Sequence, residues 1–286
     1  MLQRVRNNLL LVALVVGVMS AGMGLTPSSA RAYHTYEERL LDSTAYSLQR
    51  RRIRIGLFNL SYGIIDQLQV TTYTMPWLLG AIFQDVAPNL KLKSTFYTHK
   101  RLALSASFGF LTGTIEQIEN VAATKARYYF FPVSLAASVR INSDVSLHIG
   151  GMFTGVNGDA DSKPGATDVE GAAAVDILQF WAMTEWRLSR VVAFTFTVRW
   201  VPWVSDIIVR GSLDSDNPDV GAQLKLEFTD LNNAFAVIPG FVFSWARANI
   251  RLGVGYGDFF VEGFAIVVPG DVLSNVSPEF DIFVRF

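Results

Sequence analysis

Three histidines, His34, His99 and His148, are the side chains in this sequence best suited to proton transfer. A serine beside a histidine supplies the nucleophile and base of acyl transfer and lipid hydrolysis. Ser146 lies two residues before His148, so in a β-strand both side chains would share one face. The sequence places neither an acid nor an oxyanion donor beside them. We therefore interpret His148 as part of a polar lining and assign no catalytic residue.

Two acidic segments are the candidate cation sites, because carboxylate oxygens are the ligands that Ca²⁺ prefers. Neither segment has the ligand spacing of a calcium-binding loop, and neither a zinc ligand set nor a phosphate-binding glycine loop is present. The chain has no cysteine, which excludes disulfides and thiolate sites. We predict solvated loops, no metal and no cofactor. The acidic residues are Asp159, Asp161, Asp168 and Glu170 in one segment, and Asp214, Asp216 and Asp219 in the other.

Short segments with period-two alternation position these residues. Residues 102–110, 193–200 and 235–245 each place large apolar side chains on one face and mostly small or polar ones on the other. A soluble sandwich also alternates, but its polar face is rich in Lys and Glu, whereas here it holds Ser, Thr, Gly and Ala. The pattern predicts an all-β fold, a transmembrane antiparallel up-and-down β-barrel of about 12 strands. Counts of ten or 14 stay open because residues 191–229 divide into two strands or four.

The composition agrees with a membrane barrel. Half of the residues are hydrophobic and the mean hydropathy is +0.30. After the first 30 or so residues no stretch approaches the roughly 18 apolar residues that a spanning helix needs. The longest candidate, Met75 to Phe83, contains Pro76 and Gly80. Apolar residues spread over short segments are typical of strands that show lipid only every second side chain.

Residues 1–32 have the pattern of a secretory signal. Arg4 and Arg6 precede an apolar run from Leu9 to Met19, and residues 30–32 form a small-x-small cleavage pattern. An uncleaved anchor helix is the alternative. We predict a cleaved signal peptide, a periplasmic segment at 33–47 and an outer-membrane barrel at 48–286. Without the signal the chain keeps 21 basic against 25 acidic residues, which argues against a nucleic-acid partner.

The chain ends on an alternating strand with a terminal aromatic residue. Phe280, Ile282, Val284 and Phe286 share one face of it. This ending resembles that of the bacterial outer-membrane barrels, whose closing strand is read by the barrel-assembly machinery. The resemblance implies that machinery and outer-membrane lipid as partners.

A second resemblance covers one hairpin. Tyr62 to Leu68, with the sequence YGIIDQL, is similar to the Tyr-Gly-Leu-Thr-Asp-x-Leu turn of barrels related to the phenol meta-pathway transporter group, with Ile65 in the place of Thr. The likeness implies architecture. An aromatic substrate suggested by it is speculative.

The connections give an orientation. Short turns at 99–101, 142–144, 189–190 and 247–249 alternate with longer polar stretches at 116–127, 157–170 and 212–219. In outer-membrane barrels short turns face the periplasm and long loops face outward. The cluster of Arg50 to Arg52 with Arg54 is interpreted as a strand end near lipid headgroups. Aromatic residues near strand ends are assigned to interfacial girdles: Tyr128, Tyr129, Trp181, Trp186, Trp200, Trp203 and Trp245.

Alternation also places charged side chains in the lumen, where opposed charges either close the barrel by pairing or line a passage. The predicted function is a non-enzymatic channel or uptake protein for small solutes, with a small-molecule solute as partner. A lipid-modifying enzyme that uses His148 and a closed structural or surface-interaction barrel are the alternatives. The predicted lumen residues are Lys91, Lys93, Arg140, His148, Asp176, Arg199, Lys225, Glu227 and Arg251, together with Asp281 and Arg285.

Overall fold

The computed structural model describes residues 43–74, 76–77, 88–119, 122–162, 169–205, 207–213, 221–226, 234–245, 247–261, 266–268 and 275–286. The predicted signal peptide, His34 and most of the predicted periplasmic segment lie outside these ranges, as do Glu227 and the acidic residues Asp168, Asp214, Asp216 and Asp219. Within the described ranges, no helix combines the length and hydrophobicity needed to cross a membrane.

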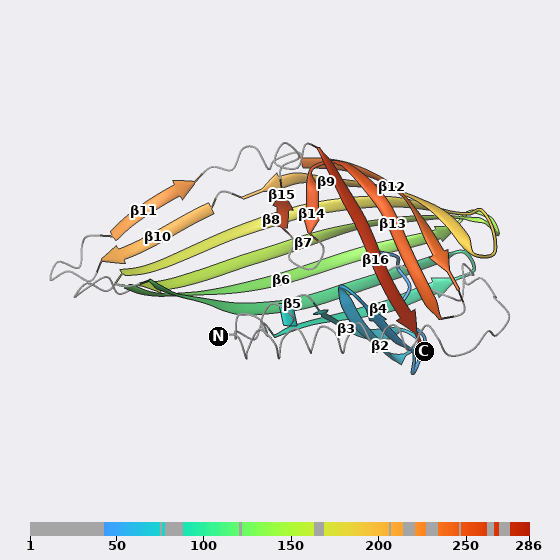
Figure 1. Ribbon diagram of the computed structural model, residues 1–286, viewed down its shortest axis with the longest axis horizontal. Helices are drawn as coiled ribbons and strands as arrows, with labels where there is room; N and C mark the ends of the chain where they lie inside the picture. Colours follow the sequence, from blue (N-terminus) through green and yellow to red (C-terminus); the bar gives the residue numbers. More distant parts are fainter. Residues whose placement is uncertain are drawn as a thin grey trace, which may run out of the picture.

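The described chain is built of β-strands with the following bounds (Figure 1). They are β1 Ile53–Gly56, β2 Asn59–Ile65, β3 Leu68–Tyr73, β4 Asn89–His99, β5 Leu102–Glu119, β6 Ala122–Arg140, β7 Val145–Ser162, β8 Val169–Arg187, β9 Val192–Val204, β10 Ile207–Leu213, β11 Gly221–Leu226, β12 Ala234–Ser244, β13 Ala248–Gly257, β14 Phe259–Val261, β15 Ile266–Val268 and β16 Val276–Arg285.

Twelve of these strands close into a ring. Each strand from β1 to β8 pairs with the next, β1 also pairs with β16, and the order continues through β13, β12 and β9. The pairing of β8 with β9 completes the barrel. Strand β10 follows β9 in the chain and pairs with the same neighbouring strand, β8. Strand β11 pairs with β10. The described strands β10 and β11 within residues 191–229 therefore add no further members to the closed ring, and the predicted barrel of about 12 strands is confirmed.

The apolar face of the strands points outward. On β12 the outward Phe235 is 46% exposed and its neighbour Ala234, which points inward, is 3% exposed. The same inversion holds on β9, where Phe196 and Trp200 are exposed and Thr195 and Thr197 are buried. A soluble sandwich would bury the aromatic face instead. The predicted lipid-out, lumen-in alternation is therefore confirmed, and the protein is a transmembrane β-barrel.

Strands β5 to β8 are longer than the membrane requires. They contain 18 or 19 residues each, whereas about ten cross a bilayer. Figure 1 shows them running side by side toward the end where β10 and β11 lie, opposite the C-terminus. The predicted loops 116–127 and 157–170 are thus mostly strand. The hydropathy pattern did not indicate these strand extensions. Outside the membrane both faces of a strand meet water, so apolar and polar residues need not alternate there.

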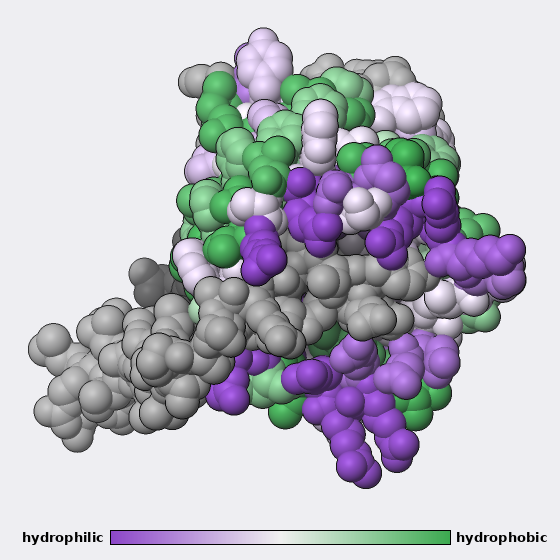
Figure 2. Space-filling view, turned by 90° about the vertical axis from the view of Figure 1, so that its right-hand side faces the viewer, coloured by the Kyte–Doolittle hydropathy of each residue, from purple (hydrophilic) through white to green (hydrophobic). Residues whose placement is uncertain are grey.

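The short turns share one end of the barrel with the C-terminus, and we call this the periplasmic end. Here the backbones of Ile53 and Phe286 exchange two hydrogen bonds, at 3.1 and 3.0 Å, which tie the last strand to the first. Hydrophilic side chains gather around this end of the barrel (Figure 2). Phe280 and Phe286 are exposed on the outer face of the closing strand, whereas Val284 is buried.

Candidate functional site

Five charged side chains line the interior on β1, β9, β13 and β16. Arg54 Nη2 lies 2.7 Å from Asp281 Oδ2. Glu279 holds two arginines, with Oε1 2.8 Å from Arg199 Nη1 and Oε2 3.2 Å from Arg251 Nη2. All five side chains are at most 15% exposed. We call this set the charged belt. Salt screens charged pairs in such a buried wall less than it screens pairs at the protein surface.

Arg54 was not expected in the interior. The sequence interpretation grouped it with Arg50 to Arg52 at a headgroup-facing strand end, but Arg54 is 4% exposed and paired with Asp281. The pleat explains the difference, because Ile53 points outward at the start of β1 and the next side chain must point inward. The Arg54 guanidinium also lies 3.9 Å from the Phe283 ring centroid, a cation–π contact.

Hydroxyl and lysine side chains line the neighbouring wall. Lys91 and Lys93 lie on the inner face of β4, and Lys93 is buried. Hydroxyls beside them bond across strand pairs: Ser61 with Thr71 at 2.9 Å, and Ser107 with Ser134 at 2.7 Å. This part of the wall is therefore built of polar groups.

The other predicted lumen residues lie in different places. Asp176 shares the outer face of β8 with Leu178 and Phe180 and pairs in register with Gly155. Arg140 has inward parity but sits at the periplasmic rim, where its Nε donates to Asn142 O at 3.0 Å. Lys225 lies in β11, where the structure describes its backbone only, and Glu227 is outside the described residues.

His148 is hydrogen-bonded to a serine of the neighbouring strand β6. Its Nδ1 lies 2.7 Å from Ser138 Oγ on β6, and its Nε2 lies 3.6 Å from Glu185 Oε2 on β8. Because Ser138 Oγ accepts a hydrogen bond from Ala45 N, we assign its own proton to His148 Nδ1. The imidazole is 2% exposed and Ser138 is fully buried, so neither group meets a substrate in this arrangement.

Residues 43–49, which we call the interior segment, lie inside the barrel near its periplasmic end. The side chains of residues 44–48 are all buried. Trp181 Nε1 donates to Ser43 O at 3.1 Å, and Ala45 and Tyr46 pack against Ala103. Residues 43–47 therefore occupy the barrel interior, where the sequence suggested a position in the periplasm.

Trp181 differs from its predicted place in an aromatic girdle. It has the inward parity of Met183, and its ring fills the space beside Gly150, where an added Cβ would lie 2.2 Å from Trp181 Cζ2. Trp186, Trp200 and Trp203, by contrast, are exposed on the outer face. The sequence pattern does not distinguish this inward tryptophan, because its neighbours Phe180 and Ala182 are apolar too.

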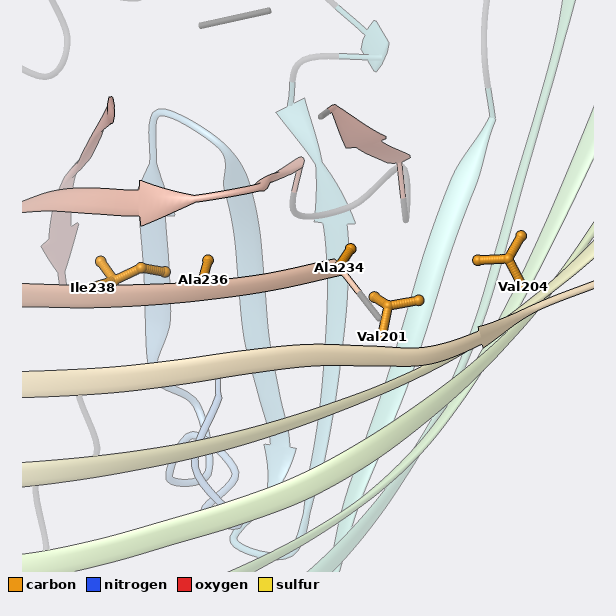
Figure 3. Close-up of a cluster of buried hydrophobic side chains, with 5 residues drawn as sticks. All are labelled: Val201, Val204, Ala234, Ala236 and Ile238. Atoms are coloured by element: carbon orange, nitrogen blue, oxygen red, sulfur yellow. The ribbon is translucent and has the colours of Figure 1, made fainter. Parts of the chain in front are cut away.

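An apolar strip on β9 and β12 is a second feature that the sequence did not reveal. Figure 3 shows its five buried side chains, and Val175 and Ile177 of β8 pack against them. Arg199 of the charged belt pairs in register with Ala236 of the strip. The interior thus passes directly from charged to apolar lining along one strand pair. The strip consists of Val201, Val204, Ala234, Ala236 and Ile238.

No protein-family model and no curated protein matches the chain. Among solved structures it is similar to the toluene transporter TbuX of Ralstonia pickettii, with 9% identity, a TM-score of 0.40, and 83% of this chain and 78% of that chain covered. The Vibrio cholerae outer-membrane protein OmpT matches at 13% identity and a TM-score of 0.35 over 80% of this chain. The chain spans 63% of the OmpT length. The functional argument therefore rests on this chain's own interior.

Proposed function

We propose that the protein is an outer-membrane channel or uptake barrel for small solutes, preferring anions, and that the interior segment closes its periplasmic end. The observation that carries the proposal is the charge of the lining. Among inner-face side chains that the structure describes below the rim, basic residues outnumber acidic ones by five to three. The basic residues are Arg54, Lys91, Lys93, Arg199 and Arg251, and the acidic ones are Glu185, Glu279 and Asp281.

An excess of fixed positive charge on a low-dielectric wall raises the local concentration of anions. The acids compensate the arginines unequally, because Glu279 serves two of them. Lys91 and Lys93 lie on β4, away from the strands of the charged belt. Neutralising them removes two positive charges from the lining, and we therefore expect these lysines to contribute to selectivity.

The test is single-channel recording in a planar bilayer of the refolded protein carrying Thr95→Val and Ser138→Ala, which remove two hydroxyls that hold the interior segment. We expect discrete anion-selective steps from this protein, and we expect Lys91→Gln with Lys93→Gln in the same background to reduce the anion preference. Lys100→Gln, at an exposed periplasmic turn, is the matched control and should leave the preference unchanged. A double variant with unaltered ion selectivity would contradict the assignment of the lining.

A closed structural barrel is the competing function, and the interior segment is the observation that favours it. It predicts silence in the bilayer even when the segment has been displaced, from a protein that circular dichroism shows to be folded β-sheet. Conductance after displacement supports a channel and excludes the closed barrel.

A further inference from the structure

The wall holds the interior segment, and the β2–β3 turn holds the next residue, Arg50, through the main chain. Four side-chain oxygens accept from four backbone amides spread over residues 45–50, and Thr95 Oγ1 also donates to Ala45 O at 2.8 Å. The acceptors come from β3, β4, β6 and the β2–β3 turn, so they converge from separate parts of the wall. The bonds are Ala45 N to Ser138 Oγ at 2.7 Å, Ser47 N to Thr95 Oγ1 at 2.9 Å, Leu48 N to Gln69 Oε1 at 2.8 Å, and Arg50 N to Asp66 Oδ1 at 2.9 Å.

The hairpin singled out in the sequence forms one side of this site. Gly63 exchanges backbone bonds with the chain just before β1: Arg51 N donates to Gly63 O at 2.8 Å, and Gly63 N donates to Arg52 O at 2.9 Å. The Gln49 carbonyl rests where a Cβ of residue 63 would be. The glycine and the aspartate of this hairpin thus make room for the chain and bind it.

The segment is attached less firmly than a barrel strand. The barrel strands pair in continuous antiparallel ladders, whereas the segment depends largely on bonds to side chains. Between the segment and β1 the chain turns sharply at Arg51, which has a left-handed φ of 62°. Such a backbone is strained for a residue other than glycine. We infer that the segment would separate from β1 at this turn.

We propose that this wall is a binding site for an extended polypeptide backbone, occupied by residues 44–50 of the chain itself and open to exchange with a free peptide. Four amides and one carbonyl are bound, so recognition depends on main-chain groups and on side chains small enough for the buried places of Ala45 and Ser47. This inference extends the proposed channel function. Only the conductance measurement depends on that function.

The experiment uses a single-cysteine reporter, since the chain has no native cysteine. Leu48→Cys places a thiol at a buried position whose side chain has no polar bond to lose. We expect slow maleimide labelling of the folded protein and, when Thr95→Val and Ser138→Ala are added, labelling faster by roughly tenfold or more, because local opening then costs less. Thr154→Val with Ser107→Ala is the matched control, because neither of its hydroxyls is bonded to the segment in the structure.

A second measurement tests exchange with the wall intact. Ala45→Pro with Ser47→Pro removes two amide donors from the segment and leaves the acceptors in place. A fluorescent peptide of residues 43–50 should then bind saturably, and adding Thr95→Val and Ser138→Ala should weaken binding by roughly tenfold or more. Equal labelling in wall and control variants, or peptide binding that ignores the wall variants, overturns the inference. Faster labelling without conductance leaves the inference standing and rejects the channel.

Discussion

Gly63→Ala provides a direct test of how the interior segment is seated. A Cβ at this position would lie 2.0 Å from Gln49 O, 2.8 Å from Gln49 C and 2.9 Å from Leu48 O. All three are main-chain atoms, so no side-chain rotation relieves the overlap. Strand β2 is paired on both edges, with β1 and with β3, and we therefore expect the segment to move instead of the strand.

The change in the docking free energy of the interior segment has two contributions. Overpacking at a tight site costs about 1–3 kcal/mol. Losing the hydrogen bonds of the seat adds about 0.5–1.5 kcal/mol for each bond. A shift of about 3 kcal/mol in the docking equilibrium corresponds to roughly a 100-fold change in the undocked population. Because β2 keeps its ladder bonds, the unfolding free energy of the barrel should change much less than the docking free energy.

Hydrogen exchange measured by mass spectrometry separates these effects. Amides of residues 45–50 should lose protection in Gly63→Ala, while the amides of β12 keep it. Gly155→Ala is the control, since its Cβ would meet only Asp176 Oδ1 at 3.4 Å. Unchanged protection of residues 45–50 in a folded Gly63→Ala protein would refute the seating argument.

Three further outcomes are expected. Glu279→Gln leaves two arginines without their shared carboxylate and should lower the unfolding free energy by about 3 kcal/mol in denaturant titrations. A loss below about 1 kcal/mol would mean that solvent screens these ion pairs. The bond from Arg187 lowers the pKa of Asp144 below its ordinary 3.8, so the stabilisation by this carboxylate is present above about pH 4 and disappears as pH falls through the lowered pKa. A higher denaturation midpoint for the wild type than for Asp144→Asn should therefore be seen at pH 7 and vanish in strong acid. Phe286→Ala should reduce the amount of folded barrel in outer-membrane fractions if the terminal aromatic residue is an assembly signal, and an equal yield would count against that role.

The sequence predicted the barrel because lipid imposes a strict rule on it. Outward positions of a membrane strand are mostly apolar, and this determines the phase of residues 193–200 and 235–245. Outside the membrane the rule disappears, so the sequence predicts loops where β5 to β8 extend. Asp176 shows the same limit, because the apolar stretch around it left the phase of β8 undetermined.

The charged positions on clear strands were predictable, and the interior segment was not. Lys93, Arg199 and Arg251 follow from parity alone. Residues 43–49 are short, carry no alternation and are bound by side chains of strands far along the chain, such as Ser138. Contacts of this kind depend on register and on space inside the barrel, as the inward ring of Trp181 beside Gly150 illustrates. The local sequence pattern contains no information about the register of distant strands or about the space inside the barrel.

By pairing, the lumen charges could close the barrel, or they could line a passage. Arg54 pairs with Asp281 and Arg251 pairs with Glu279 on adjacent strands, whereas Arg199 on β9 reaches Glu279 on β16 past β12 and β13. The charged belt therefore covers the wall between β9 and β1, and the interior segment bonds to β3, β4, β6 and β8. Under the proposed function, selectivity and closure therefore depend on different residues. We expect lysine and belt variants to change which ion passes, and variants of the segment's seat to change whether any ion passes.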